Sequence, residues 1–180
     1  MKDQSIQKFK WFWAWQDEKE EAWLAEMARE GLHLEDVTLP ALYHFRKGTP
    51  AEYVYRLDFQ TLKSKDRASY LQLFADAGWE HIGDMGGWVY FRHRVDGTEI
   101  PEIYSDLESK LGKYQRVMLY LVVFLPIVSI LLPINSQIDY FGPVVLGAIE
   151  LFSFLLILIF SYSLVMLFRR INQLKKRIKE

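Results

Sequence analysis

The 180-residue chain contains no cysteine, so it has neither disulfide bonds nor thiolate chemistry. It also lacks the Gly-x-Ser-x-Gly, His-Glu-x-x-His and P-loop motifs of common catalytic sites. The glycine-rich stretch 83–87 precedes a predicted strand, whereas a phosphate-binding loop would open a helix, so we interpret it as a turn. These absences argue against an enzyme, and we expect no cofactor.

Histidine is scarce and unevenly spaced. The four histidines, His33, His44, His81 and His93, include no pair at the spacing of metal ligands. We therefore expect no metal site.

An excess of basic residues is also missing, because the net charge is −1. Residues 1–100 hold 13 Lys and Arg against 17 Asp and Glu, and residues 101–180 hold 9 against 6. A nucleic-acid-binding domain would present a basic face to the phosphates. We therefore expect no direct contact with nucleic acid.

Two long apolar runs are present near the C-terminus, over residues 117–134 and 141–168. Each is long enough to cross a hydrocarbon core of about 30 Å as a helix. Residues 135–140 between them are too few for a domain. The sequence therefore predicts a two-helix transmembrane hairpin with an extracytoplasmic loop at 135–140.

Basic residues near the membrane predict the orientation of this hairpin. The loop has none, whereas both flanks carry several: Lys110, Lys113 and Arg116 before the first span, and Arg169, Arg170, Lys175, Lys176, Arg177 and Lys179 after the second. Lys and Arg accumulate on the cytoplasmic side. We expect a two-pass protein of the cell membrane with both termini in the cytoplasm.

Residues 6–96 read as one small α+β domain. Alternating apolar residues predict strands at 8–15, 39–46, 53–59 and 88–94, and residues 39–46 and 53–59 should pair as a hairpin. Helical spacing predicts helices over 17–31 and 65–77, ending at Gly31 and Gly78. This order predicts a ferredoxin-like β-α-β-β-α-β fold with both helices on one face of the sheet.

The aromatic residues of the first predicted strand, Phe9, Trp11, Trp13 and Trp15, have two interpretations. Aromatic rings exposed on a sheet can serve as a stacking platform for a planar ligand. Rings at strand spacing more often belong to a core, and we expect the core here.

One side of the predicted sheet should be open and polar. The candidate partner-binding face consists of His44, Arg46, Arg56, Asp58, Arg92 and Arg94, with Arg56 and Asp58 opposite Tyr55 and Leu57. This pattern suits an anion or an acidic partner, and the alternative is an ordinary solvated sheet face.

An amphipathic stalk helix is predicted over residues 101–116, with apolar residues at Ile103, Leu107, Leu111 and Tyr114. Ile171, Leu174 and Ile178 continue a similar stripe in the basic tail, 169–180. The two stripes could pack together, with Asp106 and Glu108 opposite Arg177 and Lys179. Alternatively, Lys175, Lys176, Arg177 and Lys179 contact anionic lipid.

Glu150 is the one ionisable residue within the second apolar run. An intramembrane carboxylate is a functional candidate by default. A span counted back about 20 residues from Arg169 would place Glu150 at the outer interface, where it costs little. A helix-pairing hydrogen bond or a transport role is the alternative.

Several blocks of the first 95 residues carry a family resemblance. They are FKWF at 9–12, EEAWLAEMA at 20–28, GLHL at 31–34, EYVYRLD at 52–58, AGWE at 77–80 and WVYFR at 88–92. In this order they resemble the DUF2812 family of bacterial membrane proteins, whose function is unassigned. Genes of this family are often found beside PadR-type regulators, so the resemblance implies a regulatory context and supplies no catalytic residues.

The sequence favours a membrane-anchored, non-catalytic regulatory or sensory module. Its cytoplasmic domain would bind a protein or small ligand, and its partners would be membrane lipids and a protein or a second copy of the chain. An accessory subunit of a membrane transporter or envelope complex is the first alternative, and an enzyme is the second.

Overall fold

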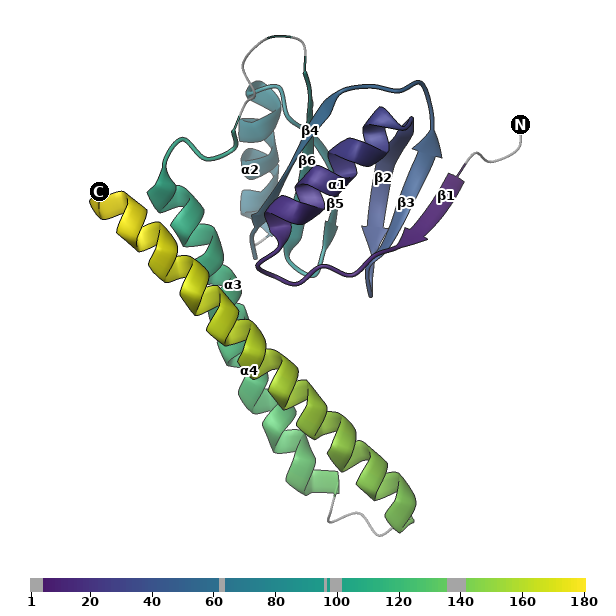
Figure 1. Cartoon of the computed structure of the whole chain (residues 1–180), viewed down its shortest axis with the longest axis vertical. Coiled ribbons are helices and arrows are strands. Elements are labelled where there is room, and N and C mark those ends of the chain that lie inside the picture. Colours follow the sequence, from purple (N-terminus) through teal and green to yellow (C-terminus); the bar gives the residue numbers. More distant parts are fainter. Residues whose placement is uncertain (1–4, 62–63, 96, 98–101, 136–141) are drawn as a thin grey trace. The chain divides into compact units, whose positions relative to one another are not determined.

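In the computed structural model, residues 5–61, 64–95, 97, 102–135 and 142–180 are described, with the backbone alone for residues 64, 124–135 and 143. The chain divides into two compact units, residues 1–109 and 110–180. The first unit is the α+β part and the second is helical (Figure 1). The α+β unit therefore reaches further than the predicted boundary at residue 96.

The α+β unit is built from one pattern used twice. The first copy is β1 (Ser5–Phe9), α1 (Asp17–Arg29), β2 (Leu32–Thr38) and β3 (Leu42–Lys47). The second copy is β4 (Tyr53–Phe59), α2 (Ser64–Asp76), β5 (Glu80–Met85) and β6 (Trp88–Arg94). Each copy forms an antiparallel three-stranded sheet in which its last strand lies in the middle, in the orders β1-β3-β2 and β4-β6-β5.

This topology confirms an α+β domain and corrects the predicted ferredoxin-like sheet. The described residues form six strands in two sheets, where the prediction has four strands in one. The predicted hairpin between residues 39–46 and 53–59 is also wrong, because β3 pairs with β1 and β2 while β4 pairs with β6. The turn after Lys47 separates the two copies and does not join paired strands.

The two missing strands, β2 and β5, each contain an irregularity. The register of β2 shifts between Leu34 and Asp36, and that of β5 shifts between His81 and Gly83. The shift places the buried residues Leu34 and Val37 of β2 three positions apart. A bulge of this kind breaks the two-residue period by which a strand is recognised.

The first strand is shorter than predicted and lies earlier in the chain. β1 ends at Phe9, and residues 10–16 form a loop and turn before α1. The backbone N–H of Gln16 donates to the Trp13 carbonyl (2.8 Å), while the Gln16 side chain accepts a hydrogen bond from the Trp13 N–H (3.2 Å). These local bonds replace the sheet pairing that a strand over 8–15 would need.

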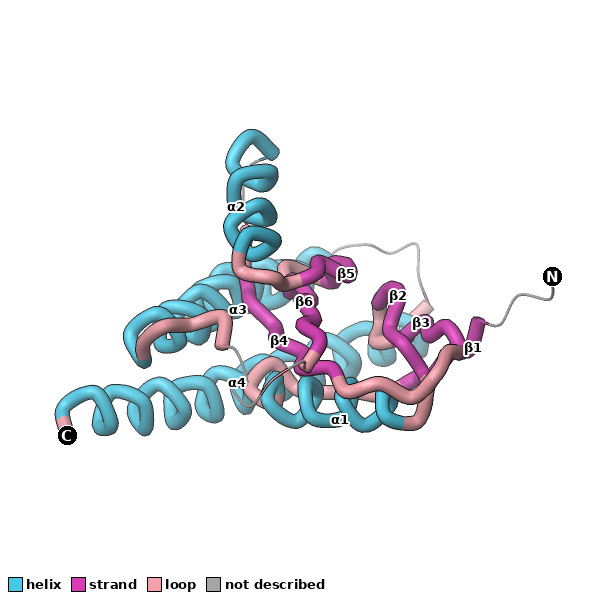
Figure 2. The backbone as a smooth tube through the Cα atoms, turned by 90° about the horizontal axis from the view of Figure 1, so that it is seen from above, coloured by secondary structure: helices cyan, strands magenta, loops and turns pink. Residues whose placement is uncertain are grey.

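The two helices lie on opposite sides of the strands, α1 below and α2 above in Figure 2, so the prediction of both on one face is wrong. The core under α1 joins the two sheets and contains Trp23, Leu24, Met27, Ala28, Leu34, Val37, Ala41, Tyr43, Phe45, Tyr55, Leu57 and Tyr90. The core under α2 contains Trp79, Val89 and Phe91, against which Val54, Tyr70, Leu71, Phe74 and Ile103 pack. β4 and β6 are therefore covered on both faces.

The ends of both helices were correctly placed by sequence. Gly31 and Gly78 follow α1 and α2 with φ of +81° and +82°, values that L side chains rarely adopt. A Cβ at Gly31 would also lie 2.6 Å from the Gly48 carbonyl oxygen. Glycine is therefore required there for both conformation and space.

The helical unit contains most of α3 (Leu107–Asn135) and all of α4 (Pro143–Lys179). Tyr114 of α3 is buried beneath the Arg170 guanidinium of α4, 5.6 Å from the ring centroid. Val117, Leu167, Ile171 and Leu174 are buried as well. The predicted stripe is thus confirmed at Tyr114, Ile171 and Leu174, whereas Ile103 belongs to the α+β core and Leu107 is exposed.

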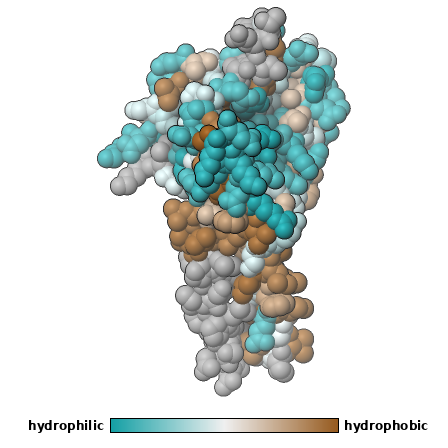
Figure 3. Space-filling view, turned by 60° about the vertical axis from the view of Figure 1, so that its left-hand side comes forward, coloured by the Kyte–Doolittle hydropathy of each residue, from teal (hydrophilic) through white to brown (hydrophobic). Residues whose placement is uncertain are grey.

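Among the described residues, α4 is a helix long and apolar enough to cross a membrane. Its apolar side chains are largely exposed, and they gather over the helical unit in Figure 3. For the first predicted span, 117–134, the side chains from 124 onward lie outside the described residues, as does the loop at 136–140.

Candidate functional site

The buried carboxylate of Asp58 on β4 collects hydrogen bonds from several elements. Asp58 is 2% exposed. Its Oδ2 accepts from the Tyr70 hydroxyl of α2 (2.8 Å) and from the Gln60 amide (3.1 Å). Its Oδ1 accepts from the Phe59 N–H (2.7 Å) and from the Tyr104 hydroxyl. Asp58 therefore connects β4, α2 and the segment that leads into α3.

We call residues Glu102, Ile103 and Tyr104 the latch segment, because each makes a contact with the α+β core. Glu102 forms an ion pair with Arg56, with Arg56 Nε donating to Glu102 Oε2 at 2.9 Å. Ile103 packs into the core under α2, and Tyr104 donates to Asp58. α3 begins three residues later, at Leu107, where Asp106 accepts from the Ser109 N–H (2.6 Å) as an N-cap.

A second buried carboxylate, Glu20 of α1, lies on the opposite side of the strands. Its Oε1 accepts from the hydroxyls of Tyr43 on β3 and Tyr90 on β6, each at 2.7 Å. Burial raises the pKa of Glu20, although the two hydroxyls partly oppose this shift. The same burial and the neighbouring Glu20 raise the pKa values of Tyr43 and Tyr90. These three side chains tie the two sheets together.

Glu21, the next residue of α1, accepts a hydrogen bond from a backbone N–H at the edge of the second sheet. β4 is an outer strand of its sheet. The Leu57 N–H of β4 donates to Glu21 Oε1 at 2.9 Å, and Arg56 Nη1 lies 3.6 Å from Glu21 Oε2. A side chain that binds an edge N–H prevents that edge from pairing with another chain.

The six residues of the predicted partner-binding face do not form one surface. His44 and Arg46 lie on β3, where His44 Nε2 is 3.0 Å from the Thr38 hydroxyl and Arg46 is paired with Glu35 at 2.8 Å. Arg92 and Arg94 lie on β6 of the other sheet, and Arg92 is paired with Glu80 at 2.7 Å.

Arg56 and Asp58 are engaged inside the fold. They lie on the side of β4 away from Tyr55 and Leu57, as predicted, but α2 and the latch segment cover that side. Of the six, only Arg46 and Arg94 have exposed side chains.

The residues predicted for the membrane and the tail all lie on α4. Glu150 is exposed in its second turn, within the apolar stretch. Lys175, Lys176, Arg177 and Lys179 are exposed in its last turns. Their positions do not test a contact with lipid or with the stalk helix, so both roles stay predictions.

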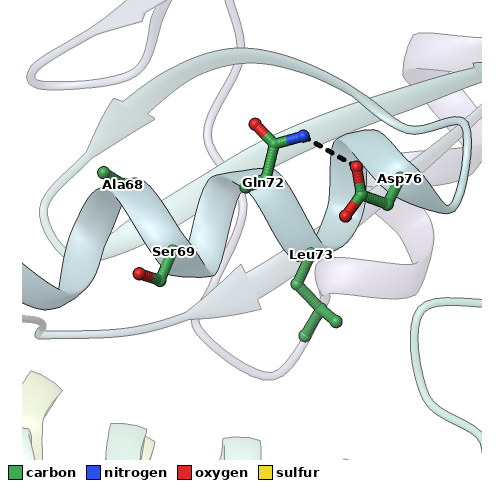
Figure 4. Close-up of a pocket in the computed structure, with 5 residues that line it drawn as sticks. All are labelled: Ala68, Ser69, Gln72, Leu73 and Asp76. Atoms are coloured by element: carbon green, nitrogen blue, oxygen red, sulfur yellow. Dashed lines mark hydrogen bonds between the residues drawn. The ribbon is translucent and has the colours of Figure 1, made fainter.

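A shallow pocket lies on the outer face of α2 (Figure 4). It is lined by Ala68, Ser69, Gln72, Leu73 and Asp76, all from this one helix, and Gln72 donates to Asp76 at 2.7 Å. No group of three or more His, Asp or Glu side chains able to hold a metal ion occurs among the described residues.

Sequence reasoning missed the latch segment and the Glu20 cluster. Ile103 fits the apolar stripe of a stalk helix equally well, so spacing could not assign it to the domain. Glu20 lies in the acidic stretch 17–21, which resembles a solvated first turn. The sequence did carry one signal. Glu20 lies three residues before Trp23 and four before Leu24, a spacing that places all three on the same, buried side of α1.

Comparison with known proteins identifies one family. The DUF2812 model, described as a protein of unknown function, matches residues 16–125. This region contains most of the α+β unit, the latch segment and the start of α3. No curated protein and no solved structure matches the chain.

Proposed function

Because the chain belongs to the DUF2812 family, whose function is unknown, we propose from its structure that it is a membrane-anchored, non-catalytic regulatory or sensory module. The observation that carries this proposal is α4, a helix long and apolar enough to cross a membrane, whose apolar side chains are largely exposed. The α+β unit would be the binding part, and the latch segment would connect it to the anchor.

The anchor is proposed to be a two-pass hairpin with both termini in the cytoplasm. Support comes from the basic residues beside both apolar runs and from the contact of Tyr114 with Arg170, which brings the basic ends of α3 and α4 together. A cysteine-free chain allows a direct test. In intact cells, an impermeant maleimide should label a Gln137→Cys variant and spare a Gln173→Cys variant. Labelling of Gln173→Cys would contradict this topology.

The binding face is proposed to lie on the outer side of the β1-β3-β2 sheet. α1 covers the inner side of this sheet, whereas Arg46 is exposed on the outer side. Crosslinking of the full chain in native membranes, followed by mass spectrometry, should capture a partner that is lost with Arg46→Glu. Arg94→Glu, exposed on the other sheet, is the matched control. Equal loss with both variants would contradict the assignment.

An accessory subunit of a membrane transporter or envelope complex is the second candidate, and Glu150 is the observation that favours it. This carboxylate is exposed on an otherwise apolar stretch of α4. A helix of another protein could donate a hydrogen bond to it. Loss of a membrane-protein crosslink with Glu150→Gln, but not with Arg46→Glu, would favour this candidate over the first.

A further inference from the structure

The loop before α1 carries three tryptophans, of which Trp11 is exposed and Trp13 and Trp15 are half-buried. Phe12 points inward and packs on Trp23 and Tyr43, with centroids 5.7 and 6.4 Å apart. The alternate residues form what we call the tryptophan ladder, Trp11, Trp13 and Trp15. The Trp11 and Trp13 rings are 5.9 Å apart edge to face, and the Trp13 and Trp15 rings are stacked at 5.4 Å. The expectation that these aromatic residues belong to the core is therefore wrong for Phe9 and Trp11, which are exposed, whereas Trp13 and Trp15 are half-buried.

The ladder begins at an exposed apolar corner of the β1-β3-β2 sheet. Phe9 is 64% exposed, Trp11 is 53% exposed and Leu39 is 74% exposed. Phe9 pairs with Leu42, and the Lys10 N–H donates to the Ala41 carbonyl at 3.2 Å, so Leu39 lies in the turn at the same end of the sheet. Exposed large apolar side chains gathered in this way indicate a contact surface.

The charge of this segment differs from that of the rest of the unit. Residues 5–16 include two lysines and no acidic residue, although residues 1–100 carry more acidic than basic side chains. Tryptophan and phenylalanine beside lysine are the residues that occupy the interface of an anionic membrane. The chemistry of the corner therefore fits a lipid surface.

The tether between the domain and the membrane is short, if the topology of the proposed function holds. Tyr104 is bound to Asp58, and the first predicted span begins at Val117. Three extended steps and ten helical steps separate these residues, which allows about 25 Å at most. A domain of about 100 residues has a radius of gyration of about 13 Å and a diameter of about 30 Å. Such a tether keeps the domain within its own diameter of the bilayer.

We propose that the tryptophan ladder, together with Phe9 and Leu39, is a membrane-contact site that inserts into the interface of the anionic cytoplasmic leaflet. Indole rings would lie at the headgroup level. Lys10 Nζ lies over the Phe12 and Trp23 rings, 5.3 and 4.6 Å from their centroids, so this lysine adds positive charge to the corner from the Phe12 side of the loop. This inference rests on the proposed membrane anchor. It follows that the α+β unit would bind the lipid surface itself as well as a soluble partner.

The six tryptophans allow a sharp test, because all of them precede residue 89 and none lies in the apolar runs. The full chain would be reconstituted in nanodiscs of phosphatidylcholine and phosphatidylglycerol, with or without bromine on the acyl chains near the headgroups. Bromine quenches nearby indoles. With two or three of six indoles at the interface, brominated lipid should reduce the emission by about a fifth to a third.

Two variants locate the quenching. Trp11→Phe/Trp13→Phe should reduce the quenched emission at least about twofold, because Phe keeps an aromatic ring at the interface without the indole signal. Trp79→Phe, in the core under α2, should leave the quenched emission unchanged. Equal emission in brominated and unbrominated nanodiscs would overturn the proposal. Quenching that persists undiminished in the double variant would overturn it as well.

The anchor is tested separately by alkaline extraction of native membranes. A chain that is extracted would overturn both the anchor and the contact site. A chain that stays in the membrane but shows no quenching would overturn the contact site alone.

Discussion

At the scale of single residues, Glu20 is a carboxyl whose ionisation the fold opposes. Burial raises its pKa above the ordinary value of 4.5. Below pH 4.5 the group is protonated in both the folded and the unfolded chain. As the pH rises further, the unfolded chain loses this proton first, so the free energy of unfolding falls until the pH has passed the folded pKa. The Glu20 contribution to stability is therefore greatest in acid.

Glu20→Gln removes this dependence because the amide stays neutral. We expect the free energy of unfolding of Glu20→Gln, relative to the native chain, to increase from pH 4.5 towards neutral pH, by about 1.4 kcal/mol for each unit by which the pKa is raised. Chemical denaturation in detergent, followed by tryptophan fluorescence, measures it. Glu26→Gln, exposed on the same helix, is the control, and equal pH profiles for the two variants would contradict the prediction.

Two glycines with positive φ allow the cost of an unfavourable backbone conformation to be measured separately from the cost of a steric clash. Gly31 has φ +81° and a Cβ there would meet the Gly48 carbonyl oxygen at 2.6 Å, whereas Gly86 has φ +58° and nothing within 4 Å. Gly86→Ala should cost about 1 kcal/mol for conformation alone. Gly31→Ala should cost about 1–3 kcal/mol more, because backbone must move. Equal losses in denaturation experiments would show that the approach of residue 48 is easily relaxed.

At the scale of elements, the latch segment should be as ordered as the strands that it contacts. Tyr104→Phe removes a donor to buried Asp58 and should cost about 1–2 kcal/mol. Hydrogen exchange at residues 102–106 should then become faster, while exchange in α1 stays unchanged. Arg46→Gln, which breaks the exposed pair with Glu35, should change stability by less than about 1 kcal/mol. Exchange that is already fast in the native chain would contradict the latch.

The helices and strands that were predicted correctly from sequence are those in which the spacing of apolar residues is unbroken. β4, β6 and α2 have regular spacing, and their bounds lie close to the predicted ones. β2 was missed because its bulge spaces Leu34 and Val37 by three. Alternation placed the stripe of Phe9 and Trp11 in the core, although both are exposed, because Phe12 and the tryptophans are all apolar and residues 10–16 form a loop. Contacts between distant residues, as at Asp58, leave no local pattern.

At the scale of the whole molecule, the basic tail has two competing roles. If Lys175, Lys176, Arg177 and Lys179 support the packing of α3 on α4, changing all four to Gln should reduce helix order even in neutral detergent. If they contact lipid, at about 1 kcal/mol per residue near an anionic surface, the change should matter only when anionic lipid is present. Their exposure favours lipid. Circular dichroism in the two environments distinguishes the roles.

The latch segment also defines where this protein can be cut. A fragment that ends after β6 at Arg94 would lack Ile103, so the apolar surface formed by Phe74, Phe91 and Trp79 would lose its cover. It would also lose the Tyr104 hydroxyl that Asp58 binds. We expect this fragment to aggregate and a fragment ending at Ser109 to remain monodisperse in size-exclusion chromatography. The smallest piece that folds without the anchor therefore ends among the residues that lead into the membrane, well past the last strand.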